Sequence, residues 1–325
     1  MLVAHLSNLW LGKLLAMHRS LVLLLILLSA AGCGLAEQVA PTTTVTTTTT
    51  TTTLPPTIPT TAEASITDES PCLAGDRPFA REGIISAFGG ANGDAAQLSK
   101  LRWASHPGCE RVVVELLTAD GAPAGAIDPV GVDYNAQTGV IRVSLPEAIT
   151  RSAIADTRFD GELVSGAFVV ATQAGTLAVD LHVVPESALA LRAYEVDSPS
   201  RIVIDVRPDE VATPVVGAAV GTSVVLLSPA PDSTEETVQV RGYVRGESGD
   251  VNVTISRMSE DPAVVFETTI TPLRGNLWQE FATVVRGLPA GVLQFEATAQ
   301  RDRAGMPARV TIDTTDRSIP EPPEA

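Results

Sequence analysis

The chain has 325 residues, of which 45% are hydrophobic and only 4% aromatic, and its formal net charge at pH 7 is −16. This hydrophobic content supports folded cores built from Val, Ile, Leu and Ala. An acidic chain without a basic block lacks the cationic contacts that supply most of the affinity for nucleic acid and for anionic lipid headgroups. The composition therefore argues against nucleic acid as a partner and against electrostatic adsorption to a membrane.

The N-terminus carries the features of an export signal. The pair His18-Arg19 precedes an apolar run at residues 21–28, which is shorter than the roughly 20 residues of a transmembrane helix. Small residues at 29–32 then lead directly into Cys33. A basic region, a short apolar region and a small-residue cleavage site are typical of secretory signals. We expect cleavage before Cys33.

The position of Cys33 directly after Ala31-Gly32 resembles the lipobox of bacterial lipoproteins, although Ala30 stands where that pattern more often has leucine. The resemblance implies that Cys33 is acylated and becomes the mature N-terminus. The predicted location is extracytoplasmic, with the lipid on Cys33 as the membrane anchor. The alternatives are a plain secretory signal with an incidental cysteine, or a signal-anchor helix, which basic residues interrupt. The choice between Met1 and Met17 as the start stays open.

The chain contains three cysteines. If Cys33 carries lipid, Cys72 and Cys109 are left as one possible disulfide in an oxidising compartment. That bridge would close a loop of about 37 residues. Metal binding is the alternative, but these two cysteines lack a CxxC spacing. We predict the disulfide, and neither a metal site nor a cofactor.

Residues 33–64 are rich in threonine and proline and include eight consecutive threonines from Thr46 to Thr53. Such a segment cannot bury a core, so we predict a solvated, extended tether, whose glycosylation stays open. At roughly 3 Å per residue it could hold a folded part about 90 Å from the anchor.

Residues 65–208 are predicted to form a strand-rich first domain. Alternating or β-branched runs at 111–116, 140–145, 176–184 and 201–206 predict strands, and frequent glycines predict turns between them. Residues 95–103 are predicted to form a short helix, and residues 146–155 are a weaker helix candidate.

Two of these runs suggest a strand pairing. Arg111 and Glu115 share one face of their strand, and Arg201 and Asp205 share one face of theirs. We predict that the strands pair antiparallel with Arg111 opposite Asp205 and Glu115 opposite Arg201, because opposite charges across strands favour that register.

The same strands carry a family resemblance. Residues 198–206 resemble the closing strand of the AMIN domain, residues 109–115 its opening strand, and residues 139–143 and 175–181 its middle strands. The resemblance implies a β-sandwich that localises envelope proteins by binding peptidoglycan. The middle section of this chain is longer than that family's pattern.

After a predicted linker at residues 209–222, residues 223–314 show seven strand-like runs, which suggest an antiparallel β-sandwich. The runs begin near Ser223, Thr237, Asp250, Ala263, Gln279, Val292 and Arg309. Segments at 227–232, 238–242, 278–281, 294–298 and 302–305, together with Gly291, resemble the immunoglobulin-like domain of bacterial spore-germination proteins, which is accessory and has no known active site. Trp278 and Phe281 could mark a binding face, although core positions are the favoured interpretation. Residues 315–325 are predicted to be a disordered acidic tail.

The sequence contains few candidates for catalytic residues. Asp180 and His182 lie two residues apart on a predicted strand and face the same side, as a base with its orienting group or two metal ligands would. A solvated strand face is the favoured interpretation of this pair. The sequence has no GxSxG, HExxH, P-loop or GxGxxG motif.

The whole chain is thus predicted to be all-β, with two β-sandwich domains in tandem after a lipoprotein signal (residues 1–32) and a tether. The predicted function is a non-catalytic cell-envelope lipoprotein that displays binding modules for peptidoglycan or a wall-associated protein. A structural or assembly factor of an envelope complex is the first alternative, and a cryptic wall-polymer hydrolase is the second.

Overall fold

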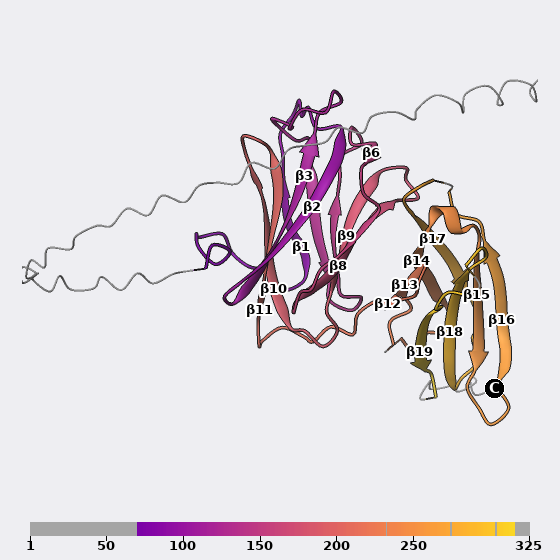
Figure 1. Ribbon diagram of the computed structural model, residues 1–325. Helices are drawn as coiled ribbons and strands as arrows, with labels where there is room; N and C mark the ends of the chain where they lie inside the picture. Colours follow the sequence, from indigo (N-terminus) through magenta and orange to yellow (C-terminus); the bar gives the residue numbers. More distant parts are fainter. Residues whose placement is uncertain (1–69, 232, 274, 303, 316–325) are drawn as a thin grey trace, which may run out of the picture. The chain divides into compact units, whose positions relative to one another are not determined.

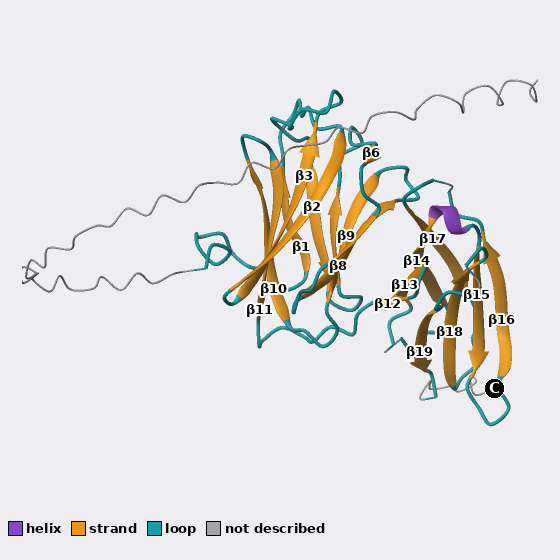
Figure 2. Ribbon diagram, viewed as in Figure 1, coloured by secondary structure: helices purple, strands orange, loops and turns teal. Residues whose placement is uncertain are grey.

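The computed structural model describes residues 70–231, 233–273, 275–302 and 304–315. These residues form strands and loops with a single 3-10 turn, η1 (Gly246–Ser248), and the all-β prediction is confirmed (Figures 1 and 2). The predicted signal, acylated Cys33 and tether lie outside the described residues, as does nearly all of the predicted tail.

The N-terminal module (residues 70–215) contains two layers of strands around one core. One layer is a five-stranded sheet in the order β10-β11-β3-β2-β6, and the other has the order β1-β4-β5-β9-β8, with β7 paired to β8. The strands are β1 (Gly83–Phe88), β2 (Gln97–His106), β3 (Cys109–Leu117), β4 (Val130–Asn135), β5 (Val140–Ser144), β6 (Arg151–Ser152), β7 (Asp156–Arg158), β8 (Val164–Ala171), β9 (Leu177–Val183), β10 (Leu189–Val196) and β11 (Arg201–Pro208). Aliphatic side chains fill the space between the layers, as the shortage of aromatic residues requires.

The C-terminal module (residues 219–315) has its own core between two further layers. One has the order β17-β14-β13-β12 and the other β16-β15-β18-β19. The strands are β12 (Ala219–Val220), β13 (Val224–Ser228), β14 (Val238–Arg245), β15 (Val251–Arg257), β16 (Ala263–Ile270), β17 (Trp278–Val285), β18 (Val292–Ala299) and β19 (Ala308–Asp313). Each of the seven predicted strands begins within one residue of its predicted position. The short strand β12 lies in the predicted linker and pairs with β13.

A ten-stranded sheet runs through both modules. Strand β17 pairs in parallel with β8, with Trp278 opposite Val170 and Gln279 opposite Ala171. Strand β8 can accept this partner because β7 occupies only the other part of the same edge, opposite residues 166–168. The pairing makes the backbone hydrogen bonds of one module continuous with those of the other.

The predicted register of β3 and β11 is confirmed. Arg111 lies opposite Asp205 and Glu115 opposite Arg201 in an antiparallel pair. Arg111 and Asp205 form an ion pair with 2.6 Å between Nε and Oδ1. Glu115 instead pairs with Arg102 on the other neighbouring strand, β2, also at 2.6 Å.

The predicted helix at residues 95–103 is wrong, because residues 97–103 belong to β2 and the two before them form no helix. Leu98 and Leu101 are both buried, and a spacing of three is the spacing of a helix face. The register between β2 and β3 shifts between Leu98 and Lys100, so the strand has an irregularity that places both leucines on the core side. Residues 146–155 form no helix either: they are mostly loop around β6, with Ile149 buried.

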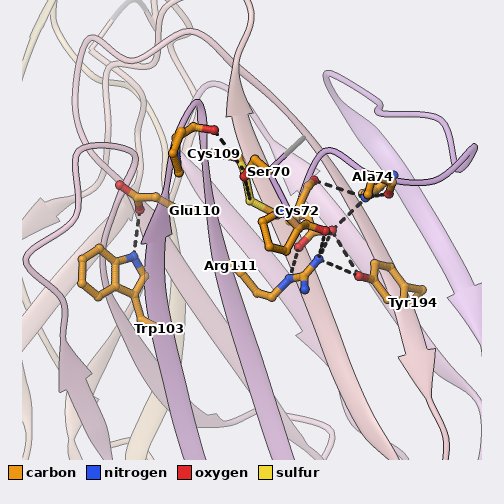
Figure 3. Close-up of a disulfide and its surroundings, with 12 residues drawn as sticks. Ser70, Cys72, Ala74, Trp103, Cys109, Glu110, Arg111 and Tyr194 are labelled. Atoms are coloured by element: carbon orange, nitrogen blue, oxygen red, sulfur yellow. Dashed lines mark hydrogen bonds and ion pairs between the residues drawn. A yellow bond between two sulfur atoms is a disulfide. The ribbon is translucent and has the colours of Figure 1, made fainter. Parts of the chain in front are cut away.

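A strap of residues 70–80 crosses the outer face of the five-stranded sheet. The predicted disulfide between Cys72 and Cys109 fastens it to the start of β3, with 6.3 Å between the two Cα atoms (Figure 3). At its other end Ala80 exchanges two backbone hydrogen bonds with Leu191 on β10, each of 2.8 Å. The strap therefore has a covalent attachment at one end and a strand-like attachment at the other.

We expect Cys72→Ser/Cys109→Ser to destabilise the N-terminal module. The bridge spans 37 residues, and a loop of that size stabilises the folded state by about 3–4 kcal/mol in the chain-entropy model. Urea unfolding monitored by circular dichroism, with and without reductant, measures the effect. Equal stability of the double variant and the oxidised parent would contradict the expectation.

Candidate functional site

Three of the residues singled out in the sequence meet where the two modules join. Asp180 and His182 lie on β9, and Trp278 lies on β17. Their exposed fractions are 0%, 4% and 2%, so the interpretation of Asp180 and His182 as a solvated strand face is wrong. The face is covered because the C-terminal module packs against it. Phe281 is buried in the C-terminal core, so none of these residues offers an exposed binding surface.

Arg142 on β5 is the charged centre of this junction. It lies opposite Asp180 in the sheet and binds both carboxylate oxygens, with distances of 2.8 Å from Nε and 2.7 Å from Nη2. Its Nη1 reaches Glu280 of the C-terminal module at 3.0 Å. Burial lowers the pKa of Arg142, but its hydrogen bonds and the charges of both carboxylates raise it by more, so the net shift is upward. Arg142 is therefore a permanent cation that links the two modules.

Four rings form a largely buried cluster beside Arg142, in which Phe168 is partly buried and the other three are buried: Phe168, His182, Tyr243 and Trp278. Phe168 lies at the centre, with ring centroids 4.6 Å from His182, 5.5 Å from Tyr243 and 4.9 Å from Trp278. Nε2 of His182 contacts the hydroxyl of Tyr243. Burial lowers the pKa of His182 to about 4 and raises that of Tyr243 well above its ordinary value. Both groups are thus neutral near pH 7, where their contact serves packing instead of proton transfer.

Asp156 on β7 completes the polar contacts of the junction. Its Oδ2 accepts a hydrogen bond of 2.8 Å from Nε1 of Trp278 and one of 2.6 Å from Arg245. The guanidinium of Arg245 also lies over the Trp278 ring, 5.3 Å from its centroid. The polar edge of the tryptophan is therefore satisfied, as a buried indole requires.

The junction contains two accessible hollows. One, of about 330 Å³, is lined in part by Asp156, His182 and Trp278. The other is a cleft of about 410 Å³ between β4–β5 and β13–β14. Its polar lining includes Asp133, Asn135, Gln137, Arg142, Gln239 and Arg241. Sequence reasoning missed the cleft because these residues come from two modules and share no motif. Their amide and guanidinium groups suit hydrogen bonding to a polar ligand.

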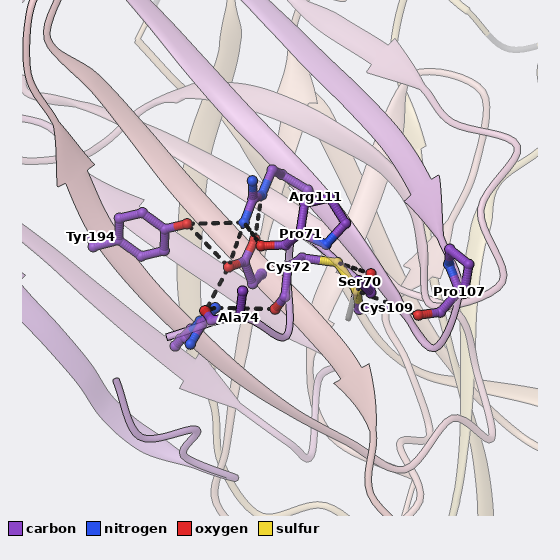
Figure 4. A network of polar contacts seen from close by, with 10 residues as sticks. Ser70, Pro71, Cys72, Ala74, Pro107, Cys109, Arg111 and Tyr194 are labelled. Carbon is purple, nitrogen blue, oxygen red and sulfur yellow. Dashed lines mark hydrogen bonds and ion pairs between the residues drawn. A yellow bond between two sulfur atoms is a disulfide. The ribbon is translucent and has the colours of Figure 1, made fainter. Parts of the chain in front are cut away.

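A second charged network holds the strap on the five-stranded sheet (Figure 4). Asp205 is fully buried and receives hydrogen bonds from Arg111, from Arg192 at 3.1 Å and from the Tyr194 hydroxyl at 3.2 Å. Arg192 also donates to three carbonyl oxygens of the strap, those of Cys72 (3.2 Å), Ala74 (2.7 Å) and Arg77 (3.3 Å). These contacts are structural, and they explain why Arg192 is buried in spite of its charge.

Among residues 70–315, leaving aside positions 232, 274 and 303, no group of three or more His, Cys, Asp or Glu side chains is placed to hold a metal ion. The described part of the chain also contains no helix with the length and apolar character needed to cross a bilayer.

No protein-family model matches the chain, and no curated protein matches it in sequence. The resemblances to AMIN and immunoglobulin-like domains therefore stay predictions from the sequence.

Stability should depend on His182 between pH 6.5 and pH 4. The unfolded chain takes up this proton near pH 6.5, whereas burial holds the folded pKa at about 4. The unfolded state binds more protons than the folded state in that window, so the free energy of unfolding falls as the pH is lowered from 6.5 to 4, by on the order of 3 kcal/mol. Below pH 4 both states carry the proton, and His182 adds no further change. Urea unfolding at several pH values measures the slope.

His182→Gln should flatten this slope, and His106→Gln, at the other histidine of the expected mature chain, should leave it unchanged. An identical pH dependence in the parent and in His182→Gln would show that the buried ring does not couple to folding.

Arg142→Met should destabilise the protein by about 3–5 kcal/mol, because it leaves the buried charge of Asp180 without a partner. Arg142→Met/Asp180→Asn should recover part of the loss, since the uncompensated charge is then removed. Arg309→Met is the matched control: Arg309 is half-exposed and pairs with Glu296, so its loss should cost no more than about 1 kcal/mol. Equal effects of Arg142→Met and Arg309→Met on urea unfolding would refute the assignment.

Proposed function

We propose that this chain is a non-catalytic cell-envelope lipoprotein, anchored through a lipid on Cys33, that displays binding modules for peptidoglycan or a wall-associated protein. The observation that carries the proposal is the continuous junction, in which a shared sheet and the Arg142 contacts join two β modules. A joined body on a long tether suits the display of binding surfaces at a distance from a membrane.

The state of the candidate acid–base residues supports binding over hydrolysis. A general acid or base has to reach a substrate and exchange a proton near the working pH. Asp180 is fully buried, with both carboxylate oxygens bound by Arg142. His182 is buried against Tyr243, and its pKa of about 4 leaves it neutral near pH 7. Asp180 is thus fully engaged in the junction, and His182, although it lines a hollow of about 330 Å³, is neutral there and bound to Tyr243.

The sequence resemblances bear on the choice of ligand. The resemblance of the first module to AMIN domains favours peptidoglycan, and the immunoglobulin-like resemblance of the second favours an accessory role. The export signal, the cysteine and the Thr/Pro-rich segment place both modules outside the membrane in this proposal.

One observation favours the assembly-factor alternative. Strand β16 is an edge strand of the four-stranded sheet, and Val264 and Val265 on it are 61% and 37% exposed. Exposed edges with apolar side chains can pair with a strand of another protein. In that alternative the bound partner is a protein and not a wall polymer.

The full-length chain, purified in a mild detergent, should sediment with isolated cell-wall sacculi at 50 mM and at 150 mM salt. A Cys33→Ser variant expressed in a bacterial host should leave the membrane fraction, because the acylated thiol is then missing. Failure to sediment at both salt concentrations would remove the wall-binding function and leave the assembly factor as the better candidate. Unchanged membrane fractionation of Cys33→Ser would remove the lipid anchor.

A further inference from the structure

The outer face of the five-stranded sheet gathers positive charge in an acidic protein. Residues directly opposite each other in a sheet point to the same face, so the register places Arg201 beside Glu115 and Lys100, and Arg192 beside Asp205 and Arg111. The opposite face of the same strands, with Val112, Ile204 and their neighbours, packs into the core. The basic face is therefore the side turned away from the core.

Six of the eleven basic residues between positions 65 and 208 lie on this face, against two acids. Both acids already have partners: Asp205 binds Arg111 and Arg192, and Glu115 binds Arg102. The basic side chains are Lys100, Arg102, Arg111, Arg192, Arg201 and Arg207. Three of them, Lys100, Arg201 and Arg207, form no ion pair with any described residue, although Arg207 lies over the Phe79 ring of the strap. The face thus has cations left over for an external anion.

The uncovered end of the face contains a groove of about 260 Å³. Arg102 and Arg201 line it on either side of Glu115, together with Ser99 and Pro199. The side chain of Arg102 is 61% exposed, whereas the strap covers the other end of the face around Arg111 and Arg192. An anion entering the groove would meet two guanidinium groups that can each donate two hydrogen bonds.

The overall charge of −16 does not prevent such binding. Charges farther away than a Debye length, about 8 Å at physiological ionic strength, are largely screened at a protein surface. A ligand at the groove therefore responds to the local surplus of cations more than to the net charge. Glu115 lines the groove itself and already binds Arg102. Next to Arg201 along the chain are Asp197, in the β10–β11 turn, and Glu195, on β10, which accepts a hydrogen bond of 2.5 Å from Ser200.

We propose that this basic face binds an anionic wall polymer whose charge is carried by phosphodiester groups, an inference that rests on the wall-binding function proposed above. A phosphodiester chain carries one uncompensated negative charge per repeat, whereas peptides of the wall carry amines as well as carboxylates. A linear polymer can also engage the groove at Arg102 and Arg201 and continue to Lys100 on the same face. The bound chemistry is repeated phosphate contacts by arginine and lysine.

Sedimentation with two preparations of the same sacculi tests the inference. One retains its phosphodiester-linked polymer and the other has been stripped of it with cold hydrofluoric acid. The full-length chain in detergent should bind the first at least tenfold more tightly than the second at 50 mM salt. Arg102→Ala/Arg201→Ala should lose at least tenfold in binding to the unstripped sacculi, and Arg102→Lys/Arg201→Lys should retain most of it.

The control is Arg257→Ala/Arg286→Ala, which removes two exposed arginines of the C-terminal module and should bind like the parent. Thermal unfolding checks that each variant is folded. We expect the Arg102 variants to fold, because Arg102 is largely exposed and its ion pair with Glu115 contributes little to stability. Equal binding to both preparations, unaffected by Arg102→Ala/Arg201→Ala, would overturn this inference and leave the wall-binding function intact. Binding to neither preparation would overturn both.

Discussion

The guanidinium of Arg142, held between carboxylates of two modules, is the interaction on which the joined structure depends. A charge removed from water is tolerated only when its partners are complete, because desolvation costs several kcal/mol for each ion. Asp180 from its own sheet and Glu280 from the C-terminal module supply those partners. The modules cannot separate without returning all three charges to water or leaving one unpaired. The neighbouring rings add apolar burial to the same surface.

The same rule governs the strap on the far sheet. Asp205 is buried because Arg111, Arg192 and Tyr194 all donate to it. Arg192 in turn lies 4.7 Å from the centre of the Phe79 ring, which the strap supplies. The buried carboxylate of Asp205 therefore holds two arginines, Arg111 and Arg192. A single negative charge cannot neutralise both of them. Asp205 and the strap thus account for Arg111 and Arg192, whereas Arg102 and Arg201 lie at the end of the face that the strap leaves uncovered.

These two networks assign different tasks to the charged residues. At the junction the charges are paired and mostly removed from water, so they contribute cohesion. On the outer face of the five-stranded sheet they are unbalanced and partly exposed, so they are available to a ligand. The proposed function of a tethered binding protein would use both properties, because a rigid junction fixes the orientation of the binding surface relative to the second module.

Local sequence patterns determined much of the fold. Alternating side chains and turn residues located the seven strands of the C-terminal module, because both signals arise within a few residues of the chain. Complementary charges predicted the register of β3 and β11, and the number of cysteines predicted the disulfide between Cys72 and Cys109. The failure at residues 95–103 has the same local origin. The irregularity in β2 spaces Leu98 and Leu101 as a helix would, and only the neighbouring strand distinguishes the two structures.

The tertiary structure alone decided which polar residues are buried and which surface is charged. Alternation shows that Asp180 and His182 share a face, but a face covered by another module carries the same pattern as one exposed to water. The basic face and the junction cleft combine residues that are far apart in the sequence, and those of the basic face are interspersed with acids along the chain. Charge averaged along a chain gives no sign of such a surface, because strand pairing, not sequence distance, sets which charges become neighbours.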